Sequence, residues 1–205
     1  MDLIRQIHKH LAFLYGSEAS EAIFEQLSGI LEKFQRDNPH LTDHRAERRL
    51  TQADAILITY GDQIQAPDRP ALQPLTETLN QHLKGIISSV HLLPFYPYSS
   101  DDGFAVIDYT AVDARMGSWA DVLSLRKNFR LMFDAVINHI SVQSEWFQGF
   151  LRDDKKYRSY FITVDPAADL SSIVRPRTHP LLTPFETAAG VKYVWTTFSA
   201  DQADL

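Results

Sequence analysis

The sequence contains no cysteine, and this absence removes several kinds of chemistry at once. A chain of 205 residues without cysteine forms no disulfide, has no thiolate nucleophile and holds no cysteine-ligated zinc ion. It also lacks an apolar run of about 18 residues, the length that suggests a membrane span. Residues 1–15 mix charged with apolar side chains, which is not the pattern of a secretory signal. These absences predict a cytoplasmic protein that does not enter a membrane.

An excess of positive charge is missing as well. The net charge is −6 at pH 7, and no stripe of Lys and Arg is interleaved with aromatic residues, which argues against nucleic-acid binding. The short basic cluster Arg45, Arg48 and Arg49 is interpreted as part of a solvated linker. What the chain does contain is enough apolar material, 44%, to bury a core, and its length suggests one domain or two small ones.

Two amphipathic helices are predicted at the amino terminus. Apolar residues recur at helical spacing over 3–14 and again over 23–34, with a break at Tyr15-Gly16-Ser17 and an end at Asp37-Asn38-Pro39. Residues 1–50 are therefore expected to form a helical preface and a linker, and the preface is expected to pack on the rest of the protein.

Strand and helix patterns then alternate. Strands are predicted over 55–60, 86–93 and 130–137, with helices over 72–83 and 118–128 between them, the second helix beginning with a capping box at Ser118. This β-α-β-α-β order predicts an α/β fold with parallel strands. A helix follows over 144–151, and from residue 161 onward only 191–197 has the pattern of a strand.

The ends of two predicted strands carry polar and aromatic groups. After the strand in 86–93 the loop presents flat rings beside two carboxylates: Phe95, Tyr96, Tyr98, Phe104, Asp101 and Asp102. Such a set suits a sugar, although Ser-Ser-Asp-Asp-Gly is also good turn chemistry. The strand over 130–137 ends at Asn138-His139, and His139 alone could equally be a hydrogen-bonded structural residue. In parallel α/β folds, functional sites are built at this edge of the sheet.

Several segments together resemble a known family. They are Leu57-Ile58-Thr59-Tyr60, VHLLPFYPYSSDDGF followed by VIDY, DAVINH, SEWF, RPR at 175–177, and WTTFSADQADL at the carboxyl end. From about residue 50 onward the chain resembles the sucrose phosphorylase group of the α-amylase family (glycoside hydrolase family 13), and within it the glucosylglycerate phosphorylase branch. The resemblance implies an α/β (β/α)8 TIM barrel, of which 51–160 is the first part with strands one to three, and 161–205 belongs to a domain inserted after strand three.

The resemblance also implies a set of site residues. Asp101, Phe104, His139, Phe198 and Gln202 match residues that bind the substrate, with Phe104 and Phe198 as opposing aromatic walls and Gln202 toward the acceptor. Arg175 and Arg177 match a loop that binds phosphate or the acceptor, and a guanidinium group suits an oxyanion; a structural loop pair is the alternative. No cofactor and no metal ion are implied.

The implied reaction is phosphorolysis of an α-glucoside with retention, which consumes inorganic phosphate and gives α-glucose 1-phosphate. Retention requires two carboxylates about 5 Å apart. The family's R-x-D-A nucleophile motif is absent, and Asp134-Ala135 follows Met132-Phe133 in the third predicted strand, so no catalytic residue is assigned. We therefore expect the leading part of a longer enzyme, inactive alone. The alternatives are a non-catalytic sugar-binding protein and a hydrolase of the same fold.

Three parallel strands do not close a barrel. The third strand is expected to keep an unpaired edge, and Trp146, Phe147 and Phe150 are expected to lose apolar neighbours. The chain alone should therefore be marginally stable or form homo-oligomers.

Overall fold

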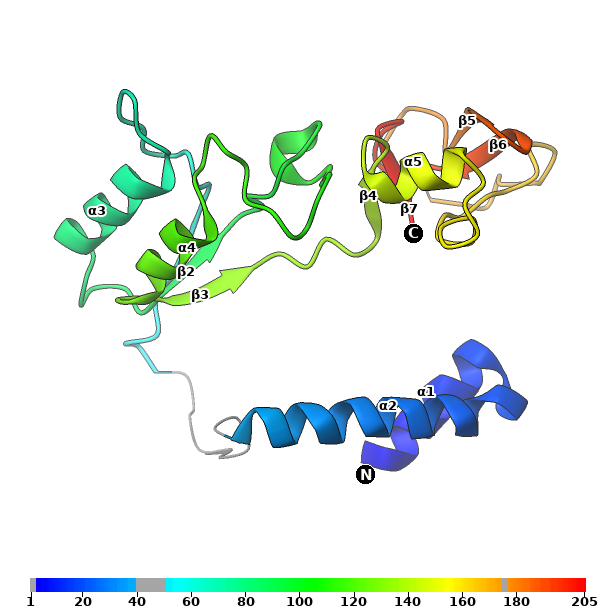
Figure 1. Cartoon of the computed structure of the whole chain (residues 1–205), viewed down its shortest axis with the longest axis horizontal. Coiled ribbons are helices and arrows are strands. Elements are labelled where there is room, and N and C mark those ends of the chain that lie inside the picture. The colour runs from blue at the N-terminus through cyan, green and yellow to red at the C-terminus, as the bar shows by residue number, and fades with distance from the viewer. Residues whose placement is uncertain (1–2, 40–50, 175–176) are drawn as a thin grey trace. The chain divides into compact units, whose positions relative to one another are not determined.

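The computed structural model describes residues 3–39, 51–174 and 177–205 of a chain that divides into two compact units, residues 1–50 and 51–205 (Figure 1). The basic cluster Arg45, Arg48 and Arg49 lies outside the described residues, as does Arg175. Among the residues described, no helix is long and apolar enough to cross a membrane.

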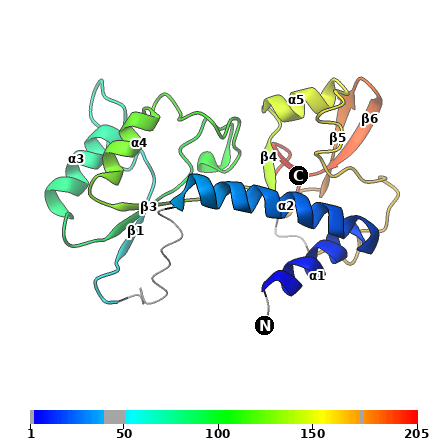
Figure 2. The ribbon, with the colours of Figure 1, turned by 60° about the horizontal axis from the view of Figure 1, so that its bottom comes forward.

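The first unit is a helical hairpin. Helix α1 (Leu3–Tyr15) and helix α2 (Ser17–Asp37) contact each other, and Gly16 joins them with a φ of 80°, which glycine adopts without strain (Figure 2). The predicted helices and their break at Gly16 are therefore confirmed. Helix α2 ends where Asn38 donates its backbone N–H to the carbonyl of Phe34.

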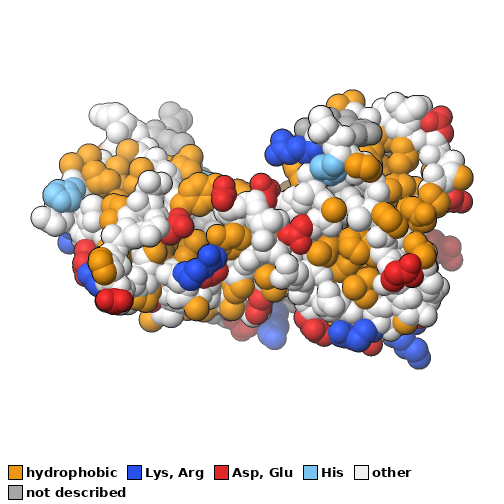
Figure 3. Space-filling model, turned by 90° about the horizontal axis from the view of Figure 1, so that it is seen from above, with side chains coloured by type: hydrophobic (Ala, Val, Ile, Leu, Met, Phe, Trp, Pro, Cys, Tyr) orange, Lys and Arg blue, Asp and Glu red, His pale blue; other side chains and the backbone are white. Residues whose placement is uncertain are grey.

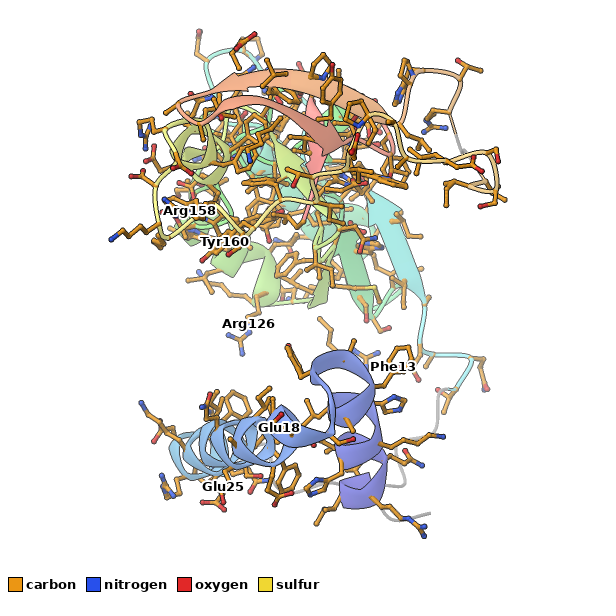
Figure 4. All side chains as sticks on the ribbon, turned by 90° about the vertical axis from the view of Figure 1, so that its right-hand side faces the viewer. Phe13, Glu18, Glu25, Arg126, Arg158 and Tyr160 are labelled. Carbon is orange, nitrogen blue, oxygen red and sulfur yellow. The ribbon has the colours of Figure 1, made fainter. Side chains whose placement is uncertain are left out.

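The hairpin buries few side chains. Leu11 is the one buried apolar residue among its described positions, and the ring of His8 stacks on Phe24 with centroids 3.8 Å apart. Phe13 is 86% exposed near the end of α1 (Figure 4). The hairpin therefore leaves a large apolar surface uncovered.

The second unit begins with a parallel sheet. Its strands β1 (Ile56–Thr59), β2 (Ser89–Leu92) and β3 (Arg130–Phe133) pair in the order β1-β2-β3. Helix α3 (Leu72–His82) connects β1 to β2, and helix α4 (Trp119–Arg126) connects β2 to β3. The predicted β-α-β-α-β order is confirmed, and so is the capping box that Ser118 forms with Asp121.

One face of this sheet is packed and the other is bare. The packed face contributes to what we call the sheet cluster: Leu72, Leu75, Leu79, Val90, Leu92, Phe95, Met116, Val122, Leu125 and Phe129. On the opposite face Ile56, Ile58 and Met132 are exposed, Ile58 to 62%. Side chains of a strand alternate between the two faces, so these residues share the face that α3 and α4 do not cover.

The remaining elements surround a second core. Strand β4 (His139–Ser141) pairs antiparallel with β7 (Gln202–Asp204), strands β5 (Leu182–Thr187) and β6 (Gly190–Trp195) form a hairpin, and α5 (Glu145–Leu151) packs against β5. They enclose what we call the aromatic cluster: Ile140, Phe147, Phe150, Phe161, Val194 and Ala203. This cluster contains residues from both sides of position 160. The predicted boundary between residues 51–160 and an inserted domain of residues 161–205 stays a prediction.

The third predicted strand was too long. Strand β3 ends at Phe133, Ile137 is 73% exposed, and His139 begins β4 instead of standing at the end of β3. The apolar residues continue from 130 to 137, so the local pattern does not show where β3 ends. The separate strand β4 forms by pairing with β7, more than sixty residues later. The second strand is also shorter than predicted, starting at Ser89.

The predicted exposure of α5 was wrong. Phe147 and Phe150 are buried, because Phe161 and Phe185 supply aromatic contacts from later in the chain. Trp146 is half-buried and packs on the rings of Tyr109 and Tyr160.

Two strands were missed after residue 161. Strand β5 was missed because it contains Pro184, and proline is not expected in the interior of a sheet. Strand β5 tolerates proline because, among the described residues, it pairs with β6 on one side only and is an edge strand. Strand β7 is too short, at three residues, for its period to be recognised.

Candidate functional site

The loop after β2 holds its backbone in an unusual conformation. Asp101, Asp102 and Gly103 have successive φ values of 57°, 50° and 105°. Aspartate and asparagine tolerate this left-handed region better than most residues, and glycine adopts it freely. At Gly103 the backbone also passes close to Pro94, where an added Cβ would lie 2.6 Å from the carbonyl oxygen. The sequence Asp-Asp-Gly therefore fixes where the side chain of Asp101 stands.

The paired strands β4 and β7 present four polar side chains on one face. His139 lies opposite Asp204, and Ser141 lies opposite Gln202. Because alternate residues of a strand point the same way, the four side chains share one face of the pair. All four residues are buried, Ser141 and Gln202 almost completely.

Gln202 connects the loop to the strand pair. Its Nε2 donates to Oδ2 of Asp101 at 2.9 Å and lies 3.2 Å from Nε2 of His139, while its Oε1 accepts from the hydroxyl of Ser199 at 2.9 Å. The same His139 nitrogen lies 3.1 Å from the carbonyl oxygen of Phe104. Residues that are far apart in sequence thus meet within hydrogen-bond distance.

An aromatic ring and a cation complete the group. The ring of Phe198 lies 5.1 Å from that of His139, at 55° between planes. The guanidinium of Arg177 lies over the Phe198 ring, with Cζ 5.9 Å from its centroid. The structure therefore brings together Asp101, Phe104, His139, Phe198, Gln202 and Arg177.

Other polar residues hold this arrangement and were not singled out from the sequence. Asp201 accepts hydrogen bonds from the hydroxyls of Ser99 and Ser100, the latter at 2.6 Å, and Ser99 also lies 2.6 Å from the hydroxyl of Ser141. These bonds join the Asp101 loop to β4 and to the residues before β7. The signal available in the sequence was the segment SADQADL, in which acidic residues flank Gln202 on both sides.

Tyr109 fixes the backbone of His139. Its hydroxyl donates to the carbonyl of Val136 at 2.6 Å and lies 3.2 Å from the carbonyl of His139. Burial, and secondarily the nearby Tyr96, raises the pKa of Tyr109 to about 12, so the hydroxyl keeps its proton at neutral pH. Tyr109 is thus a lasting donor to the start of β4.

Carboxylates at this site are poorly placed for acid–base catalysis as a pair. Asp101 and Asp102 are neighbours in one loop, and Asp204 is buried on the strand pair. In the described part of the chain no group of three His, Asp or Glu is placed to hold a metal ion. The chemistry that the arrangement supports is hydrogen bonding to hydroxyl groups, next to an apolar ring and a cation.

Comparison with known proteins shows the family of the chain. Residues 36–203 match the family model described as alpha amylase, catalytic domain. The chain belongs to the α-amylase family. The resemblance stated from its motifs is thereby confirmed, and with it the assignment to the TIM-barrel class of this family.

The similar proteins include phosphorylases. The chain is 51% identical over 204 residues to the glucosylglycerate phosphorylase of Allomeiothermus silvanus, and 42% identical over 202 residues to that of Escherichia coli. It covers 35% of each of these proteins, while they match 100% and 98% of the chain respectively. The chain thus spans about a third of the length of these relatives.

A solved structure matches the fold. The crystal structure of sucrose 6F-phosphate phosphorylase from Thermoanaerobacter thermosaccharolyticum superposes with a TM-score of 0.68 at 29% identity, over 79% of this chain and 35% of that one.

Proposed function

We propose that this chain is the glucosyl-binding part of an α-glucoside phosphorylase, with glucosylglycerate as the substrate class. The observation that carries the proposal is the convergence on Gln202, whose side-chain amide meets Asp101 and His139 from separate segments. A sugar ring is bound by such polar groups around its rim and by an apolar surface against its face, which Phe198 offers beside His139.

The roles follow from the groups present. Asp101 accepts from sugar hydroxyls, His139 and Gln202 bind further hydroxyls, and Phe104 and Phe198 bound the ring as apolar walls. Arg177, together with Arg175, binds phosphate or an anionic acceptor such as glycerate. The guanidinium of Arg177 is exposed and stacks over Phe198, which leaves its N–H groups available to an oxyanion beside the sugar.

The reaction we infer is phosphorolysis with retention, in the cytoplasm, giving α-glucose 1-phosphate. The nucleophile and the acid/base belong to the part of the relatives that this chain does not span. Support comes from similarity to glucosylglycerate phosphorylases over the whole chain and from a similarity to sucrose phosphorylase, 35% identical over 160 residues to that of Bifidobacterium adolescentis.

A chimera tests the proposal directly. Residues 1–205 are joined to the remaining part of the Allomeiothermus silvanus enzyme, and phosphate-dependent release of glucose 1-phosphate from glucosylglycerate is assayed. We expect the chimera to be active. His139→Ala should lower this activity strongly and leave the melting temperature unchanged. A folded chimera without phosphorolysis would overturn the proposal, and a variant that melts early with full activity per folded molecule would make His139 a structural residue.

Arg177 has a separate test in the same chimera. Arg177→Ala should raise the apparent constant for phosphate or glycerate more than the constant for the glucosyl donor, whereas Arg158→Ala, an exposed arginine of the second unit paired with Asp153, should change neither. Equal losses for a neutral acceptor would show that Arg177 does not recognise an oxyanion.

A further inference from the structure

Two buried side-chain atoms on the paired strands β4 and β7 lack a hydrogen-bond partner among the described residues. Nδ1 of His139 and Oδ1 of Asp204 are buried and have no hydrogen-bond partner within the described structure. The two residues are directly paired across β4 and β7, so their side chains lie on the same face of the strand pair. Buried polar atoms in folded proteins are nearly always satisfied, by protein or by an ordered water, so a pair of unsatisfied atoms on adjacent residues needs an explanation.

The other ring nitrogen of His139 cannot serve both of its neighbours. Nε2 lies 3.1 Å from the carbonyl of Phe104, which only accepts, and 3.2 Å from the amide nitrogen of Gln202, which only donates. The amide of Gln202 is oriented by Asp101, since the carboxylate there accepts from Nε2 of Gln202. The tautomer of His139 therefore decides whether Nε2 accepts from Gln202 or donates to Phe104.

Thr197 binds one carboxylate oxygen of Asp204, and the other oxygen remains available as a hydrogen-bond acceptor for His139. Oδ2 of Asp204 accepts from the hydroxyl and from the backbone N–H of Thr197, the latter at 3.2 Å, and this leaves Oδ1 toward the shared face. Burial raises the pKa of the Asp204 carboxyl, and the bonds from Thr197 and the charge of His139 act in the opposite direction. A further hydrogen bond at Oδ1 would stabilise the carboxylate form.

We infer that Asp204 is a positioning residue for His139, and that one buried water joins Oδ1 of Asp204 to Nδ1 of His139. A water with two such partners satisfies both atoms. It places the proton on Nδ1, because the hydrogen bond made by one ring nitrogen sets the state of the other. Nε2 is then an acceptor with one lone pair, which takes a hydrogen bond either from the amide of Gln202 or from a sugar hydroxyl that replaces it.

The inference deepens the proposed function and rests on it for the role of Nε2 in sugar binding. Gln202 and Asp204, two residues apart on β7, thus act on the same imidazole from its two nitrogens. Gln202 is the direct contact, and Asp204 acts through the ring.

Long-range proton–nitrogen NMR of the histidine-labelled chain tests the positioning without any ligand. His139 is assigned among the 8 histidines with His139→Gln, and its tautomer is read at a pH where the ring is neutral. We expect Nδ1–H as the dominant tautomer in the wild-type chain, loss of that dominance in Asp204→Asn, and no change in Asp165→Asn, an exposed aspartate in a loop.

Two outcomes would overturn the inference. One is an Nε2–H tautomer in the wild-type chain, which decides the matter even if Asp204→Asn does not fold. The other is a folded Asp204→Asn chain that keeps the Nδ1–H tautomer.

A titration with glucosylglycerate separates this inference from the proposed function. A shift of the His139 Nε2 resonance in the wild-type chain supports both. An unchanged resonance in a chain that shows the Nδ1–H tautomer leaves the positioning in place and counts against sugar binding.

Discussion

The sheet cluster and the aromatic cluster lie in the same unit, but the rest of the chain covers them to different extents. The sheet cluster packs against α3 and α4 and leaves the opposite face of the sheet bare, with Ile58 at 62% exposure. The aromatic cluster is enclosed on its own, with Phe147 in ring contact with Phe150, Phe161 and Phe185. A parallel sheet in this family's barrel has both faces covered, so the sheet cluster needs partners that the aromatic cluster does not.

Hydrophobic side chains also reach the surface. Figure 3 shows them in contiguous groups on the outside of the molecule. An open pocket of about 590 Å³ beside the end of β3 is lined by Phe133, Ile137, Tyr96 and Trp146, among others. Patches of this kind mark places where other elements bind. The hydrogen bonds of Asp201, Gln202 and Tyr109 are among the polar links between the two clusters.

Phe147→Ala should have the largest effect on stability. Phe147 is fully buried in the aromatic cluster, and removing such a ring costs about 3–5 kcal/mol. Phe133→Ala is the matched change at the open sheet, where the ring is already 38% exposed and the cost should be about 1–2 kcal/mol. Urea denaturation of both variants measures the loss in the free energy of unfolding. Equal losses would show that the side chains of the two regions are buried to the same extent.

Asp201→Ala should loosen the link between the clusters. The variant leaves the hydroxyls of Ser99 and Ser100 without their acceptor, at a cost of about 1–3 kcal/mol. Hydrogen exchange should show β4 and β7 opening independently of β2. Asp165→Ala, in an exposed loop, is the control. Exchange that stays coupled in Asp201→Ala would mean that the remaining hydrogen bonds, such as that between Gln202 and Asp101, or apolar packing suffice to join the clusters.

Asp113 should give the sheet cluster a small dependence on pH. Hydrogen bonds from Arg115 hold the pKa of Asp113 below its usual 3.8, so its stabilising effect is present above that value and is lost as the pH falls through the folded pKa. Arg115 is largely exposed, which limits the effect to no more than about 1 kcal/mol. The stability difference between wild type and Asp113→Asn, measured by urea unfolding from pH 7 to pH 3, should shrink toward zero. A constant difference would exclude this ion pair as its source.

Ile58→Lys should change the free energy of unfolding least, by about 0.5 kcal/mol or less, because the side chain is exposed on the bare face. We nevertheless expect it to reduce the formation of homo-oligomers, as measured by size-exclusion chromatography with light scattering. Val174→Lys, at a loop residue that is 91% exposed, adds the same charge elsewhere. If both variants reduce association equally, net charge and not the bare face controls it.

Local pattern was sufficient for much of the fold. Leu72, Leu75 and Leu79 recur at helical spacing and are all buried on α3, and the capping box at Ser118 marks the start of α4. The aromatic cluster was not predicted, because Phe147 is covered by Phe161 and Phe185 and no local period encodes that contact.

The candidate site divides in the same way. The resemblance identified Asp101, His139 and Gln202, which the structure brings together. Asp201 was missed because its partners Ser99 and Ser100 lie about a hundred residues earlier, and Asp204 because its strand is recognisable only through pairing with β4.

The left-handed loop at Asp101–Gly103 limits which sequences the chain can accept. Asparagine is the natural alternative at position 102, since it tolerates a φ of 50° at least as well as aspartate. At position 103 no other residue fits, because any side chain would meet both the positive φ and the carbonyl of Pro94. In a saturation library selected for folding, position 102 should therefore vary while position 103 stays glycine. A single base change in the codon for Gly103 would displace Asp101 without altering any of the residues proposed to bind the sugar.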